Sequence, residues 1–343
     1  MAATPTGTTR TWSYTYDALG RRTQVNDPDL GLCPRRPKRL VLTHTAFSLT
    51  LICVVDGVVA FCGGINVLDD LFDPNHGALL SPRFDFAVQV TGPLVRDVQE
   101  AALQFWLRLK VSTNIRGRDV SGAWSALQAA MQPLQTPSAP YMAGPLVNGL
   151  HRQARAALLL RDNLRNRTRI EKAYRKAIAG ARQEIIIANA YFVPGARLRH
   201  ALIHAARRGV RVRLLLQGKY EYFMQFHAAR PVFGALLAAG VEIHEYAPSF
   251  LHAKVAVIDS RWATVGSSNL DPLSLLLARE ANVVVADPPF ALDLRQRLDK
   301  AMADHGRQLD AQTYASRPLG QRFLDRLAFA IMRVMLFLTG SRY

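Results

Sequence analysis

One sequence pattern occurs twice in this chain of 343 residues, at positions that differ by 203. In each copy an aspartate is followed, after six residues, by a glycine-containing tetrapeptide that ends in asparagine. Asp56 precedes residues 63–66 in the first copy, and Asp259 precedes residues 266–269 in the second. Each copy also follows an apolar run that is rich in β-branched residues. Such internal repetition predicts a duplicated lobe with two half-sites.

Apolar runs alternate with amphipathic segments after residue 149, and this rhythm predicts an α/β fold with a central sheet. We expect helices over 163–181, 195–208, 231–239 and 289–305. We expect strands over 184–190, 210–216, 241–246, 254–258, 262–265 and 282–286. Residues 40–62 are also apolar, but Asp56 and Gly57 interrupt them. A pair of strands over 48–55 and 58–62 is therefore favoured over a membrane span.

Composition divides the chain further. Residues 132–148 contain four prolines and are typical of a linker. This linker separates a partial first lobe over 41–131 from a complete second lobe over 149–310. Residues 1–40 are expected to form a poorly ordered leader.

The C-terminal segment has apolar side chains at helical spacing over 323–339, with arginines between them. Because it is short and carries internal charges, an amphipathic helix over 319–343 that lies on a membrane fits better than a span. A terminal helix that packs on the core explains the pattern equally well.

The charge balance favours an anionic partner. Lys and Arg number 43 against 26 Asp and Glu, so the net charge is +17. Nucleic acid, a phosphate-bearing substrate and an anionic bilayer all suit such a chain. The basic segments over 161–169 and 207–213 could contact lipid phosphates or DNA, or form solvated helix faces. Three cysteines, Cys33, Cys53 and Cys62, match no metal-ligand spacing and indicate reduced thiols.

The second copy carries the residues that suggest chemistry. His252 and Lys254 stand two apart at the start of a strand, so their side chains point to one face. This pair suits a phosphodiester, because lysine neutralises the oxygens while histidine attacks phosphorus or transfers a proton. Ser267 and Asn269 could donate to the same oxygens without adding charge. Either of two acids, Asp259 and Glu280, could orient the imidazole and set its tautomer.

The second copy resembles the HxK(x4)D(x6)GSxN motif of the phospholipase D superfamily. It is matched by His252, Lys254, Asp259, Gly266, Ser267 and Asn269. Further stretches resemble its bacterial cardiolipin synthase branch, at 63–70, 84–93, 188–194 and 335–340, so the resemblance covers about 52–343.

The resemblance implies two phospholipase D-like lobes related by a pseudo-two-fold axis. In this family one histidine becomes a phosphohistidine and the other acts as acid and base, without a metal or other cofactor. The implied reaction transfers a phosphatidyl group between phospholipids. The implied partners are anionic phospholipids such as phosphatidylglycerol and cardiolipin, and the implied location is peripheral, on the cytoplasmic face of the bacterial inner membrane. Nucleic acid is not expected as a partner, and the oligomeric state stays open.

The resemblance also assigns roles to this chain's residues. The expected catalytic residues are His252, Lys254 and Asp259, and Ser267, Asn269 and Asn66 would bind the phosphate, with support from Gly266, Glu280 and Asp56. We expect His252, Lys254 and Asn269 to converge on one phosphate-sized position near Asn66.

The first copy departs from the family pattern. Its histidine and lysine should stand at 49 and 51, where this chain has Leu49 and Leu51. His44 lies five residues too early to substitute. Residues 11–23 instead resemble an Rhs-type YD repeat, which predicts a truncated or fused reading frame that has lost its first half-lobe.

Three functions therefore remain open. The chain could perform a cardiolipin synthase-like transfer that is impaired by the absent pair. It could be a phospholipase D-type endonuclease that dimerises to bring two motifs together, or an inactive lipid-binding remnant.

Overall fold

The structure is a computed structural model, and it describes residues 13–16, 22–27, 31–32, 40–45, 48–65, 71–73, 76–117, 119–131, 155–162, 166–220, 223–272 and 278–338. The chain forms two compact units, Met1–Leu40 and Val41–Tyr343. The linker predicted over 132–148 lies outside the described residues.

The first unit contains a three-stranded antiparallel sheet of β1 (Ser13–Tyr16), β2 (Arg22–Asp27) and β3 (Gly31–Leu32). Threonine, tyrosine and valine occur in β1 and β2, and these residues favour an extended backbone.

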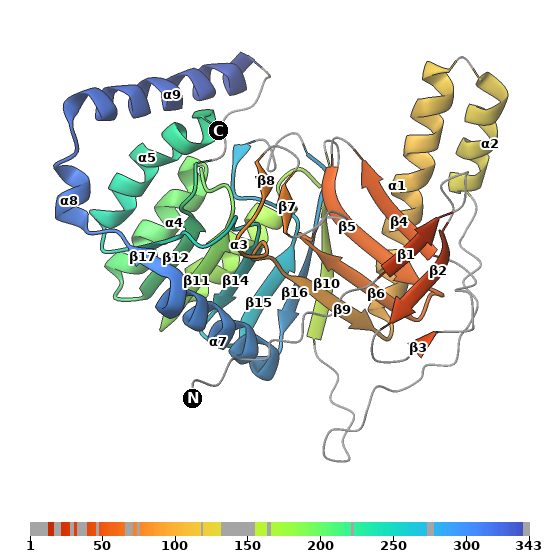
Figure 1. Ribbon diagram of the computed structural model, residues 1–343, viewed down its shortest axis with the longest axis horizontal. Helices are drawn as coiled ribbons and strands as arrows, with labels where there is room; N and C mark the ends of the chain where they lie inside the picture. Colours follow the sequence, from red (N-terminus) through yellow and green to blue (C-terminus); the bar gives the residue numbers. More distant parts are fainter. Residues whose placement is uncertain are drawn as a thin grey trace. The chain divides into compact units, whose positions relative to one another are not determined.

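The second unit is built around an eight-stranded mixed sheet in the order β10-β16-β15-β14-β11-β12-β13-β17 (Figure 1). Its three parallel strands are β11 (Glu184–Asn189), β12 (Arg211–Gln217) and β13 (Glu242–Tyr246). The antiparallel strands are β10 (Arg155–Arg161), β14 (Lys254–Ile258), β15 (Trp262–Gly266), β16 (Glu280–Ala286) and β17 (Gly306–Gln308).

Helices cover both faces of this sheet. Buried side chains of α3 (Arg169–Gly180), α4 (Ala196–Arg207) and α5 (Phe223–Leu237) form one core with one face. Helix α7 (Pro288–His305) packs on the other face. The predicted α/β fold is therefore confirmed.

A smaller antiparallel sheet shares the core on the α7 side. Its order is β4-β5-β6-β9, formed by β4 (Leu40–Thr45), β5 (Ser48–Val55), β6 (Val59–Gly63) and β9 (Ala87–Thr91). Helices α1 (Leu94–Arg116) and α2 (Val120–Met131) follow it, and the short strands β7 (Phe72–Asp73) and β8 (Gly77–Ala78) precede β9.

The internal repeat is a repeated hairpin. In the first copy, Ile52 pairs with Cys62. In the second copy, Val255 pairs with Val265, and both positions are 203 higher. Leu51 pairs with Gly63 in the same hairpin as Ile52. The turns agree as well: Asp56 and Asp259 have φ of 50° and 51°, and the next residue also has positive φ. Aspartate is one of the few side chains that tolerate this left-handed conformation, which explains why it recurs.

Some predicted boundaries differ from the structure. The helix expected from Pro231 begins at Phe223, and Pro231 lies inside it, after a turn in which Ala228 and Ala229 are buried. The helix expected over 163–181 begins at Arg169. Strand β10, which contains Arg161, was expected only as part of a basic segment.

The chain ends with α8 (Ala311–Ala315) and α9 (Leu319–Leu338), and α9 lies along α5 (Figure 1). Asp325 of α9 is buried, and it accepts hydrogen bonds from His227 Nδ1 at 2.7 Å and Arg317 Nη1 at 2.9 Å. None of the helices that the structure describes is long and apolar enough to cross a membrane.

Candidate active site

The residues of the second motif gather at one end of the eight-stranded sheet. Strand β14 begins at Lys254, β15 ends at Gly266 and β16 begins at Glu280. Because these neighbours are antiparallel, the start of one strand lies beside the end of the next. Gly266 stands against Asn282, whose side chain would lie 2.3 Å from a Cβ there, so the close approach requires glycine.

An acid from the smaller sheet's lobe holds His252. The His252 Nδ1 atom lies 2.7 Å from Asp85 Oδ2, and both side chains are largely buried. A carboxylate can only accept, so Nδ1 donates its proton to Asp85. In the neutral ring, this tautomer leaves the Nε2 lone pair available for attack.

The surroundings favour that neutral ring. Burial lowers the pKa of His252, and the charges of Lys254 and Arg83 lower it further, while the hydrogen bond to Asp85 partly opposes them. The net pKa lies below the ordinary histidine value, so the imidazole is uncharged at neutral pH, as a nucleophile would need to be.

Asp85 was not among the predicted site residues, although it lies in the stretch 84–93 that carried the resemblance. Backbone contacts place it: Phe84 N donates to Phe250 O at 3.0 Å, and His252 N donates to Phe84 O at 2.9 Å. A Cβ on Gly64 would lie 2.6 Å from Asp85 Oδ1. The sequence signal for Asp85 was therefore Gly64, at the position where the second copy has Ser267. A side chain at position 64 would occupy the space of the Asp85 carboxylate.

The remaining motif side chains are buried around this pair. Lys254 Nζ donates to the carbonyl oxygen of His252. Ser267 Oγ donates to Glu280 Oε2 at 2.5 Å, and Asn269 Oδ1 accepts from Tyr191 N at 3.4 Å. The amide nitrogen of Asn269 is therefore the atom that could donate to a phosphate.

The structure does not bring Asp259 to this site. Strand β14 is extended, so the seven steps from His252 place Asp259 about 20 Å away, at the opposite end of the strand. There its carboxylate accepts hydrogen bonds from three backbone N–H groups, those of Arg182, Gln183 and Glu184, at 2.8–2.9 Å. The motif aspartate holds the turn against the start of β11 and does not orient the imidazole. Asp56 occupies the equivalent turn in the first copy.

Replacing Asp259 by alanine should lower the thermal unfolding midpoint and leave phosphate binding unchanged. The free energy of unfolding should fall by about 1–2 kcal/mol. This decrease is modest for three hydrogen bonds because solvent reaches the turn. Burial raises the pKa of Asp259, but the backbone N–H groups together outweigh it, so the net pKa is lowered. Its stabilisation is thus complete at neutral pH and is lost as the pH falls below the ordinary aspartate pKa. Asp304→Ala, at an exposed helical position, is the control, and equal midpoints for both variants would contradict the assignment.

The first-copy positions are described in part. Asn66 lies outside the described residues, and of Leu49 and Leu51 the structure describes the backbone in β5 alone. Cys62, next to that strand, donates from Sγ to Ala281 O at 3.7 Å, so β6 meets the start of β16. Among the described side chains, no cluster of three His, Cys, Asp or Glu could hold a metal ion.

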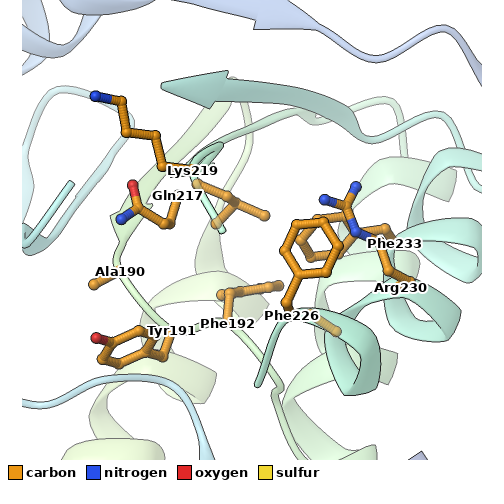
Figure 2. A pocket seen from close by; sticks show the side chains of 10 residues that line it. Ala190, Tyr191, Phe192, Gln217, Lys219, Phe226, Arg230 and Phe233 are labelled. Atoms are coloured by element: carbon orange, nitrogen blue, oxygen red, sulfur yellow. The ribbon is translucent and has the colours of Figure 1, made fainter. Parts of the chain in front are cut away.

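A small open pocket adjoins the site (Figure 2). It is continuous with the motif loop through Tyr191, which contacts Asn269, and through Gln217, whose Oε1 accepts from Leu251 N at 2.9 Å. A partly aromatic pocket beside a buried lysine and histidine could hold an amphipathic ligand. The lining consists of Ala190, Tyr191, Phe192, Leu216, Gln217, Lys219, Phe226, Ala229, Arg230 and Phe233.

Known proteins resemble this chain over most of its length. A family model described as cardiolipin synthase, PLD-like domain, matches residues 174–302, and an RHS repeat model matches residues 3–30. The chain is 37% identical over 291 residues to cardiolipin synthase B of Escherichia coli K12, which covers 84% of this chain and 64% of that protein. It is 36% identical over 309 residues to cardiolipin synthase B of Salmonella typhi, covering 89% and 68%.

The chain thus spans less than two thirds of the length of its Escherichia coli relative. The crystal structure of phosphatidylserine synthase from Haemophilus influenzae Rd KW20 has the same fold, with a TM-score of 0.55 and 16% identity. That match covers 84% of this chain and 69% of the synthase. The predicted phospholipase D-like lobes are confirmed at the level of the fold.

Proposed function

The chain belongs to the PLD-like cardiolipin synthase family, and we propose that its site binds the phosphate of an anionic phospholipid and transfers the phosphatidyl group through His252. The observation that carries this proposal is the buried His252–Asp85 pair at 2.7 Å with Lys254 beside it. An uncharged imidazole with an oriented Nε2 is a nucleophile, and a buried lysine neutralises the phosphate oxygens.

Transfer takes two steps. His252 Nε2 attacks phosphorus, the bond from phosphorus to the glycerol headgroup oxygen breaks, and the leaving oxygen takes a proton. A headgroup hydroxyl of a second phosphatidylglycerol then attacks the phosphohistidine and loses its proton, and His252 leaves with its lone pair restored. The products are cardiolipin and glycerol.

The proton donor and acceptor for both steps would come from the first-copy histidine, where this chain has Leu49. Turnover should therefore be slow, by about 10²–10⁴-fold, which is the usual contribution of general acid–base catalysis. The same leucines favour a second candidate, phospholipid binding without turnover. Incubation with labelled phosphatidylglycerol, followed by assay of cardiolipin and glycerol, distinguishes the two.

We further propose that α9 attaches the protein to an anionic bilayer. One side of α9 packs on α5 through Ala328 and Asp325. The other side exposes an apolar stripe at helical spacing, namely Phe323, Leu327, Ile331 and Val334. The packed side fits the alternative of a core-docking helix, and the exposed stripe supports the alternative of a membrane-bound one. The net charge of +17 would add attraction to anionic lipid.

Replacing Phe323 and Val334 together by glutamine should weaken binding to phosphatidylglycerol-containing vesicles about 10–100-fold. These side chains are 70% and 58% exposed, so the loss reflects apolar area that no longer enters the lipid. Vesicle flotation at low and high salt measures it, and salt should weaken the remaining electrostatic part. Leu80→Gln, at a residue that is 98% exposed, is the control. Wild-type binding by the double variant would exclude α9 as the anchor.

A further inference from the structure

Arg161 is a buried cation beside the motif. It is the last residue of β10 and pairs in register with Glu280, the first residue of β16. Residues paired across antiparallel strands project on the same face, so both side chains lie at the end of the sheet that carries the motif. Glu280 in turn accepts from Ser267. Arg161 is only 2% exposed.

The guanidinium of Arg161 has no acceptor among the described residues. Its Nε, Nη1 and Nη2 atoms are all buried there without a hydrogen bond. Burial lowers the pKa of Arg161 to about 10, and Arg167 adds to this, while the charges of Glu280 and Asp162 oppose it. The group therefore still carries its proton at neutral pH. A buried guanidinium whose N–H groups lack acceptors is unfavourable even with carboxylates nearby, and a bound anion would supply the missing acceptors.

Other arginines of low exposure in the second unit differ from Arg161 because each forms an ion pair. Arg83 lies 2.5 Å from Asp73, Arg213 lies 2.6 Å from Glu184, and Arg230 lies 2.8 Å from Glu245. These arginines have structural partners within the protein. Burial itself does not separate Arg161 from the site, because Lys254, Ser267 and Asn269 are equally enclosed.

We propose that Arg161 is a phosphate-binding residue of this site and donates to the phosphodiester of a bound phospholipid. A planar guanidinium presents paired N–H donors that match two phosphate oxygens. Transfer between two phospholipids brings two anionic phosphodiesters to one site, and the first copy supplies no lysine at position 51. The inference rests on the proposed function, which it extends to a second cation.

Arg161→Met tests the assignment. Replacing a buried charge that lacks hydrogen-bond acceptors by an apolar side chain of similar length should leave the unfolding midpoint unchanged or raise it. The dissociation constant for dihexanoyl-phosphatidylglycerol, measured by calorimetry, should rise about 10–150-fold, the equivalent of one charge-assisted hydrogen-bonded contact. Arg161→Lys should recover part of the affinity. Arg213→Met, which breaks ion pairs at the other end of the sheet, should lower the midpoint and keep the affinity.

Several results would overturn the proposal. Unfolding or a lower midpoint for Arg161→Met would show a structural arginine, and wild-type affinity would show that lipid does not reach it. Inorganic phosphate is the second probe. If Arg161→Met weakens the binding of inorganic phosphate but not that of the lipid, the ligand is free phosphate and the lipid assignment fails. The proposed function is tested separately, because cardiolipin formation with unchanged affinity in Arg161→Met would remove this inference alone. Arg161-dependent binding without any turnover would instead remove the proposed transfer alone.

Discussion

His252→Ala should abolish covalent labelling of the protein by phosphatidylglycerol that carries ³²P. No other histidine in the described chain combines a buried carboxylate partner with a place beside Lys254, so no residue substitutes as the nucleophile. In a well-studied covalent enzyme, loss of the nucleophile costs about 10⁶-fold. The adduct is a phosphoramidate, which is stable to alkali and labile to acid, and quenching at high pH followed by gel separation detects it.

Asp85→Asn should keep the label but slow its formation on the order of 10⁴-fold, as when a carboxylate that sets the histidine tautomer is neutralised. His200→Ala, on the exposed side of α4, is the control and should label normally. The labelling rate should stay constant above the ordinary histidine pKa and fall only below it, because the pKa of His252 is lowered. Labelling that persists in His252→Ala would end the phosphohistidine proposal. A wild-type protein that binds the lipid without label would leave the lipid-binding alternative.

Leu49→His combined with Leu51→Lys should raise cardiolipin formation about 10²–10⁴-fold. The β5–β6 hairpin has the register of the β14–β15 hairpin, so Leu51 stands opposite Gly63 at the position that corresponds to Lys254. Positions 49 and 51 are two apart on one strand and share a face. The new histidine would protonate the leaving glycerol, and the new lysine would neutralise phosphate oxygens.

The matched control is Leu49→Gln with Leu51→Met, which alters polarity and volume without adding an acid or a cation. Unfolding midpoints of both double variants show whether each is folded. A folded Leu49→His, Leu51→Lys protein that gains no activity would contradict the account in which the missing pair limits turnover. A wild-type rate equal to that of the variant would contradict it as well.

The sequence by itself determined the repeated hairpin, the α/β class and the shared face of His252 and Lys254. These follow from local causes: alternating apolar residues define strands, an aspartate tolerates positive φ at the turn, and the spacing of two puts His252 and Lys254 on one face. The family resemblance rested on the same local spacing.

Only the tertiary structure decided which carboxylates serve the site. Asp259 belongs to the motif yet lies at the far end of β14, whereas Asp85, 167 positions before His252, hydrogen-bonds the ring. In the sequence, Arg161 was only one residue of a basic segment. The structure shows that it pairs with Glu280 across β10 and β16. Spacing along a strand determines the face to which a side chain points. Contact between lobes and the loss of solvent depend on residues far apart in the chain, so hydrogen-bond partners and pKa shifts emerge only when the whole fold packs together.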